Sequence, residues 1–172
     1  MTSLLLTTER LILRKPDARD TEAAIAFMTS ERARHVGGPL DERQAWRAHA
    51  KMVGHWVLRG FGLFSVVDKA TDRTVGISGA YYPIDWPEKE LGWHIWDPAC
   101  EGKGIAYEAA LAARRWAYED LGWTTAVSYI APENDRSIAL AKRLGATLDE
   151  DADRPGHSPC LVYRHPAPEA LS

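Results

Sequence analysis

The chain has few cysteines and no long hydrophobic run. Its 172 residues include only Cys100 and Cys160, too few for a disulfide-stabilised scaffold and consistent with a reducing compartment. No apolar stretch approaches the roughly 20 residues that a membrane-spanning helix needs, and the N-terminus lacks the basic start of a secretory signal. We therefore expect a cytoplasmic protein without a membrane partner.

The chain also lacks a strong excess of charge and any metal-ligand motif. A net charge of −3, with no basic stripe interleaved with aromatics, argues against a nucleic-acid partner. The six histidines form no His-Glu-x-x-His motif and the cysteines no Cys-x-x-Cys motif, so no metal site is predicted. The length favours one domain over residues 1–172, with residues 166–172 as a loose tail.

Hydrophobic periodicity and capping residues predict a mixed domain of about seven strands and about four helices. Such an order of elements gives an α/β or α+β domain around a central sheet. The predicted helices contain residues 23–28, 41–60, 106–121 and 136–144, and the predicted strands cover 10–14, 63–67, 74–82, 90–96, 124–130, 146–148 and 160–163.

The segment from Pro98 to Glu108 places two glycines and a lysine between a strand and a helix. Free backbone N–H groups at the positive end of a helix dipole favour a phosphate. A nucleoside-triphosphate loop needs a Ser or Thr after the lysine, but Gly104 follows Lys103. A dinucleotide-binding turn needs a third glycine, where this chain has Tyr107. A different phosphorylated ligand is therefore expected.

At this turn the chain resembles a known family. Pro98-x-x-Glu-Gly-Lys-Gly-Ile-Ala106, followed by a helix, a strand and Asn134-x-x-Ser-x-x-Leu-x-x-x-Leu-Gly145, is similar to the GNAT superfamily of N-acetyltransferases. The chain is most similar to the branch that includes the ribosomal-protein N-terminal acetyltransferases, whose first strand resembles Thr8 to Arg14. The resemblance implies a mostly antiparallel central sheet with one splayed pair of strands.

The resemblance also implies a co-substrate. In that family the turn holds the pyrophosphate of acetyl-coenzyme A, and the pantetheine arm lies between the splayed strands. The family usually has Gln or Arg where this chain has Glu101, and a carboxylate there weakens binding unless it points away. The residues so implied in binding are the Trp96 backbone, Gly102, Lys103, Gly104, Ile105, Ala106, Asn134 and Ser137.

Glu90 is the predicted general base. It lies eleven residues before Glu101, where several family members place a catalytic glutamate. Strand alternation puts Glu90, Gly92, His94 and Trp96 on one face. The alternative is a solvated Glu90 within a charged run. His94 is either a proton relay or a packed wall residue, and a backbone N–H near Trp96 is the expected oxyanion donor.

The leaving thiolate has no obvious proton donor. Many relatives carry a tyrosine where this chain has Ala141, so Ser137 or Tyr129 would have to substitute. A thiol has a pKa near ~8.5, so modest help is enough. Cys100 has no evident histidine partner and is interpreted as structural.

The predicted function is direct transfer of an acetyl group from acetyl-coenzyme A to a primary amine, without a metal. The acceptor is a protein or peptide N-terminus or a small-molecule amine, and the protein is a monomer or homodimer. The alternative is a non-catalytic coenzyme A-binding sensor or scaffold, which Ala141 and Glu101 favour.

Overall fold

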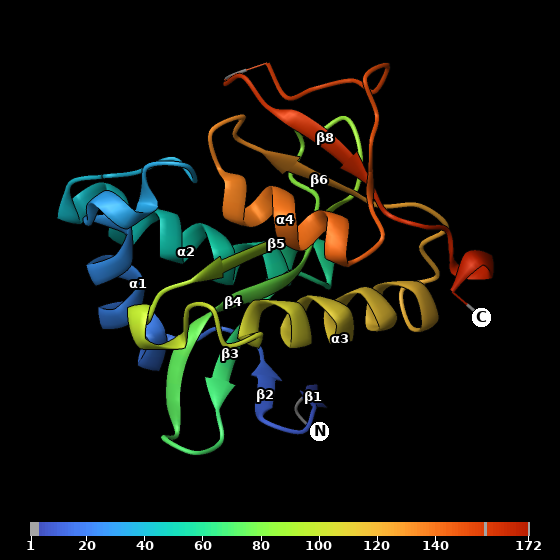
Figure 1. The fold of residues 1–172 in the computed structure, drawn as a ribbon. Coiled ribbons are helices and arrows are strands. Elements are labelled where there is room, and N and C mark those ends of the chain that lie inside the picture. The colour runs from blue at the N-terminus through green and yellow to red at the C-terminus, as the bar shows by residue number, and fades with distance from the viewer. Residues whose placement is uncertain (1–3, 157, 172) are drawn as a thin grey trace.

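A computed structural model describes residues 4–156 and 158–171, so Met1–Ser3, His157 and Ser172 lie outside the described residues. Within this part the chain folds around one eight-stranded sheet of order β1-β2-β3-β4-β5-β6-β8-β7 (Figure 1). Neighbouring strands are antiparallel except β5 and β6, which are parallel. The strands are β1 Leu5–Thr7, β2 Leu11–Arg14, β3 Leu63–Asp68, β4 Arg73–Tyr81, β5 Glu90–Ile95, β6 Val127–Ile130, β7 Thr147–Leu148 and β8 Leu161–Arg164.

Four α-helices cover the two faces of the sheet, as predicted: α1 Thr21–Met28, α2 Glu42–Arg59, α3 Ile105–Glu119 and α4 Asp135–Arg143 (Figure 1). The face under α3 packs Ala109, Ala113 and Trp116 against strand residues such as Phe64 and Leu91. On the opposite face, α1 packs Ala24 and Phe27 against Leu63 and Ile77. No helix among the described residues is long and apolar enough to cross a membrane.

The helix boundaries follow local sequence signals. Asp41 and Gln44 form a reciprocal capping box at the start of α2. Gly60 ends that helix with a φ of 77°. Gly122 and Gly145, with φ values of 67° and 82°, follow α3 and α4 in the same conformation. The predicted ends of these helices therefore lie within two residues of the observed ones.

One strand was not predicted. The structure has eight strands rather than about seven because Leu5–Thr7 pairs with β2 as the edge strand β1. The sequence Leu4-Leu5-Leu6 has no alternation of apolar and polar residues to indicate it. Leu5 is 52% exposed, as is usual for a strand with only one neighbour.

The sheet splits between β5 and β6. These strands pair only at Glu90 and Val127, whereas β4 and β5 pair along six residues from Gly76 to Tyr81. The α3 helix connects the two parallel strands and begins at the glycine turn that follows β5. The predicted splayed pair is therefore present, with the glycine turn at its open end.

Candidate functional site

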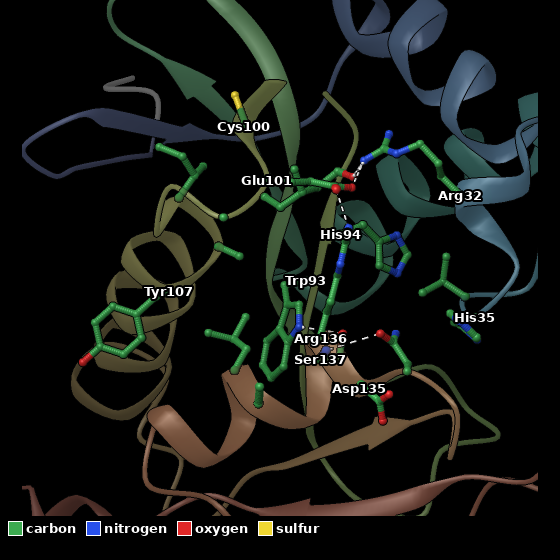
Figure 2. A pocket seen from close by; sticks show the side chains of 18 of the residues that line it. Arg32, His35, Trp93, His94, Cys100, Glu101, Tyr107, Asp135, Arg136 and Ser137 are labelled. Atoms are coloured by element: carbon green, nitrogen blue, oxygen red, sulfur yellow. Dashed lines mark hydrogen bonds and ion pairs between the residues drawn. The ribbon is translucent and has the colours of Figure 1, made fainter. Parts of the chain in front are cut away.

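A cleft of about 1150 Å³ opens where β5 leaves the sheet. Its walls are the end of β5, the glycine turn, the first turn of α3, the start of α4, and the segment around His35 that follows α1 (Figure 2). A smaller cavity next to it reaches Glu90. Predicted site residues lining one or both cavities are Glu90, His94, Gly102, Gly104, Ile105, Ala106, Asn134 and Ser137.

The glycine turn leaves an open space at the N-terminus of α3. Gly102 and Gly104 have φ values of 70° and 76°, which side chains other than glycine rarely adopt. An added Cβ at Gly102 would meet nothing within 4 Å, and at Gly104 it would lie 3.5 Å from the Arg10 guanidinium. The buried Ile105 side chain anchors the helix start in the core. The turn is thus suited to an anion.

Glu108 supports the glycine turn through hydrogen bonds to Thr8 and Arg10. Its carboxylate accepts hydrogen bonds from the Thr8 hydroxyl at 2.6 Å and from the Arg10 side chain at 2.6 Å. Arg10 in turn donates to the carbonyl of Lys103 at 2.8 Å. Lys103 itself is exposed and does not line either cavity. The segment before β2 therefore fixes the shape of the turn.

Glu101 joins three parts of the cleft. Its carboxylate accepts a hydrogen bond from Arg32, after α1, at 2.6 Å and pairs with Arg136 at the start of α4 (Figure 2). The hydrogen bond from Arg32 is the main cause that holds the pKa of Glu101 below its ordinary value. The carboxylate is thus ionised and matched by two guanidinium groups, which offsets much of its repulsion of an anion at the turn.

Glu90 lies in the smaller cavity with its carboxylate enclosed. Burial raises its pKa to about 7, although the Trp86 indole N–H and the Tyr129 backbone N–H both act to lower it. The Trp86 hydrogen bond to Oε2 is 2.6 Å long. A carboxyl group that is partly ionised at neutral pH can accept a proton and release it again. This partly buried position and the raised pKa favour the general-base interpretation of Glu90 over the solvated one.

His94 lies on the same face of β5 as Glu90 and is packed against an aromatic ring. Its imidazole centroid is 5.7 Å from that of Phe27. Burial lowers its pKa to about 4, so the ring is neutral at neutral pH. This environment favours the wall-residue interpretation over a relay that carries a positive charge.

The Trp96 backbone does not face the cleft, which corrects the expectation for that residue. Its N–H donates to the Val75 carbonyl on β4 at 2.8 Å, and its carbonyl accepts from Arg32. Backbone groups alternate in direction along a strand, so those of Trp93 and Ile95 point away from β4 into the gap. The Ile95 carbonyl accordingly accepts from Arg32 at 3.0 Å.

Asn134 and Ser137 form the first turn of α4 and face β5. The Asn134 side chain caps the helix by accepting from the Ser137 N–H at 3.3 Å. The Ser137 hydroxyl accepts from the Trp93 indole N–H at 3.2 Å (Figure 2). Because that oxygen is already an acceptor from Trp93, its own proton remains available to a group in the cleft.

Ala141, which stands where many relatives carry a tyrosine, is part of the core. Ala141 is fully buried and packs with Ile130 and Tyr163. Tyr129, the other substitute considered, has its pKa raised to about 12, chiefly by burial, and its hydroxyl accepts from the Glu88 N–H at 3.2 Å. Of the two substitutes, Ser137 is better placed.

Several residues at the site were not predicted, namely Arg32, Trp86, Trp93 and Arg136. Arg136 stands between the Asn134 and Ser137 of the quoted motif and so had a usable signal, whereas strand alternation puts Trp93 on the face opposite to Glu90 and His94. Arg32 comes from a loop distant in sequence and had none. Cys100 lines the cleft with its pKa raised mainly by burial, so it is a protonated thiol. No group of three potential metal ligands occurs among the described residues.

Comparison with known proteins agrees with this geometry. A family model described as an acetyltransferase (GNAT) domain matches residues 10–147. The crystal structure of an acetyltransferase from Agrobacterium tumefaciens strain C58 is 39% identical, with a TM-score of 0.88 over 96% of this chain and 95% of that one. A putative ribosomal-protein-serine acetyltransferase from Vibrio cholerae is 23% identical, with a TM-score of 0.74 over 96% of this chain and 100% of that one.

A curated relative is similarly distant. The uncharacterized N-acetyltransferase YnaD of Bacillus subtilis strain 168 is 24% identical over 142 residues, which is 81% of each chain. The chain therefore spans most of the length of the proteins it resembles.

Proposed function

Because the chain belongs to the acetyltransferase (GNAT) family and is an acyltransferase, we propose that it moves an acetyl group directly from acetyl-coenzyme A to a primary amine. The acceptor is a protein or peptide N-terminus or a small-molecule amine. The observation that carries the proposal is the enclosed Glu90 carboxyl, with a pKa of about 7, at the closed end of the gap between β5 and β6.

The residues of the cleft fit acetyl-coenzyme A. The open turn at Gly102 and Gly104, with the first N–H groups of α3, matches a pyrophosphate. The backbone groups of Trp93 and Ile95 that face the gap match the amides of a pantetheine arm, and Asn134 lines the opposite wall. Bound there, acetyl-coenzyme A supplies an acyl group activated as a thioester.

The proposed chemistry assigns one proton to each of two side chains. Glu90 takes the proton of the acceptor ammonium, directly or through a water, so that the nitrogen lone pair can form the new C–N bond. Backbone N–H groups of β5 polarise the acyl carbonyl. As the C–S bond breaks, the Ser137 hydroxyl donates a proton to the thiolate, and the second proton lost from the nitrogen returns to Ser137 through a water. His94 remains neutral and shapes the wall.

The test is thiol release from acetyl-coenzyme A with a panel of amines that includes peptides with free N-termini and small amines. We expect amine-dependent thiol release together with a product one acetyl group heavier by mass spectrometry. Tight coenzyme A binding without amine-dependent thiol release would instead support the sensor or scaffold alternative.

A further inference from the structure

Two side chains end the hydrogen-bond ladder between β5 and β6. The Val127 N–H donates to the Lys89 carbonyl at 3.0 Å. In a regular parallel ladder the next bond donated by β6 runs from the Tyr129 N–H to the Leu91 carbonyl. Here the Ser128 hydroxyl donates to that carbonyl at 2.6 Å, and the Tyr129 N–H faces the Glu90 carboxylate. The ladder stops where a side chain has replaced a backbone donor.

The Ser128 hydroxyl is held in this role by His165. Ser128 Oγ lies 2.9 Å from His165 Nε2, and since the only hydroxyl proton goes to Leu91, Nε2 must be the donor. The other imidazole nitrogen, Nδ1, then accepts from Arg114, which lies 3.4 Å away. Hydrogen bonds are therefore donated in one direction, from Arg114 to His165, from His165 to Ser128 and from Ser128 to the Leu91 carbonyl. Ser128 is 2% exposed and His165 is 3% exposed.

This serine–histidine pair is not a nucleophile. A serine activated for attack gives its proton to the histidine, but the Ser128 proton already lies on the Leu91 carbonyl. Both side chains are also buried. The Ser128 residue does line the small cavity beside Glu90. Ser128 therefore lies where the gap between β5 and β6 begins and takes no part in the acetyl transfer.

We propose that Ser128, oriented by His165, is a positioning residue that stops the β5–β6 ladder after Glu90 and so opens the gap for the acyl donor. The inference rests on the proposed function, because the gap is where that function places the pantetheine arm. Without the Ser128 hydroxyl, the Leu91 carbonyl is free to accept the Tyr129 N–H, and the strands close by one further ladder bond.

The experiment compares Ser128→Ala with Ser78→Ala. Ser78 is a matched control, since it is also a buried serine whose hydroxyl donates to a β5 carbonyl, that of Gly92 at 3.2 Å, but from β4, where the ladder is continuous. Coenzyme A affinity is measured by calorimetry, and hydrogen exchange of the Tyr129 amide is measured by NMR in the protein without coenzyme A.

We expect Ser128→Ala to weaken coenzyme A binding about tenfold, on the scale of one hydrogen bond, and to slow exchange of the Tyr129 amide. Ser78→Ala should leave both unchanged, and Ser128→Thr, which keeps the hydroxyl, should bind like the unchanged protein. If Ser128→Ala does not fold, Ser128→Cys, a weaker donor, should give an intermediate affinity.

Unchanged affinity and exchange in Ser128→Ala would overturn the inference, as would an equal loss of affinity in Ser78→Ala. Failure of the proposed function is distinguishable. A parent protein that binds no coenzyme A would refute that function, while the exchange of the Tyr129 amide would still decide whether Ser128 stops the ladder.

Discussion

Glu90 and His94 lie four residues apart on one strand face, and burial shifts their pKa values in opposite directions. Burial disfavours the charged form of either group, so it raises the pKa of the carboxyl to about 7 and lowers the pKa of the imidazole to about 4. At neutral pH only Glu90 exchanges a proton readily. One environment thus selects the glutamate as the base and leaves the histidine as a neutral wall.

Glu90→Gln is expected to lower kcat/KM about 100-fold at neutral pH, the usual scale for a lost general base. The loss should shrink at high pH, where more of the acceptor amine is already deprotonated. A pH profile of kcat/KM measures both effects. Equal losses at every pH would remove Glu90 from the proton transfer.

The stability of Glu90→Gln gives a readout that does not depend on turnover. The folded pKa is raised above the ordinary 4.5, so the native state binds more protons and the parent protein loses stability as the pH rises from 4.5 to about 7. The uncharged glutamine has no such loss, so the variant should gain stability relative to the parent over that window.

Trp86→Phe is the companion variant. It removes a donor that lowers the pKa of Glu90, so the acid limb of the pH profile of kcat/KM should shift to higher pH.

At the scale of elements, the cleft depends on loops that arrive from distant parts of the chain. Glu101 in the turn after β5 binds Arg32 from the segment after α1 and Arg136 from α4. This bridge connects the wall on the His35 side to the turn that is proposed to hold the pyrophosphate. A substitution at Glu101 should therefore change anion binding more than it changes the free energy of unfolding, since the three side chains are all partly or largely exposed.

Glu101→Gln is expected to tighten coenzyme A binding severalfold. It removes a negative charge beside the turn and takes away the carboxylate that offsets the positive charges of Arg32 and Arg136, although Arg32 keeps its hydrogen bonds to the Ile95 and Trp96 carbonyls. Calorimetry at two salt concentrations measures the effect, which should be larger at low salt. Glu133→Gln is the control, because Glu133 lines the same cleft outside the bridge. Weaker binding by Glu101→Gln would contradict this account and would mean that the bridge itself shapes the site.

Gly104→Ala is expected to weaken coenzyme A binding more than it lowers stability. Positive φ costs a residue with a Cβ about 1 kcal/mol, and the new methyl group would also lie at the turn itself, 3.5 Å from the Arg10 guanidinium. Gly122→Ala, at the other end of α3, has a similar φ of 67° and nothing within 4 Å of the added Cβ. Denaturant unfolding should show similar losses for both, and calorimetry should show weaker binding only for Gly104→Ala.

At the scale of the whole molecule, a buried carboxylate joins the start of α1 to the sheet. Asp20 is fully buried and accepts hydrogen bonds from Arg14 on β2, Ser65 on β3 and Thr74 on β4. Burial alone would raise the pKa of Asp20, but these donors outweigh it and hold the pKa below its ordinary value. The network fixes how the first helix, and with it the wall of the cleft, lies on the sheet.

Asp20→Asn is expected to lower the free energy of unfolding by about 3 kcal/mol, because it leaves the largely buried Arg14 charge without its buried carboxylate partner. Asp17→Asn is the control: Asp17 also lies near Arg14, at 3.5 Å, but is 42% exposed and should cost less than about 1 kcal/mol. Since the folded pKa of Asp20 is depressed, its contribution is present above the ordinary value of 3.8 and is lost as the pH falls below it. Urea unfolding at pH 7 and pH 3 measures the free energy of unfolding of both variants. A loss for Asp20→Asn that is the same at both pH values would contradict the expected pH dependence.

Local signals in the sequence were enough for most elements and for the turn. The Asp41 cap, the terminal glycines and the pattern around Gly102 and Gly104 act within a few residues, so their structural outcome was predictable. The edge strand β1 was missed because it is defined by its neighbour rather than by alternation. The direction of the Trp96 backbone was also misjudged, since it depends on which strand the N–H meets.

The sequence by itself indicated the family, because the glycine turn and the block from Asn134 to Gly145 together resemble it, and it predicted an anion site at the turn, because free backbone N–H groups lie at a helix start. Only the tertiary structure decided the chemistry around it. It partly buried Glu90 and His94, with opposite effects on their pKa values. It also brought Arg32 and Arg136 to Glu101 and placed the Ser128 hydroxyl where the β5–β6 ladder would continue. Burial and long-range hydrogen bonds are properties of packed neighbours, which local patterns in a sequence do not record.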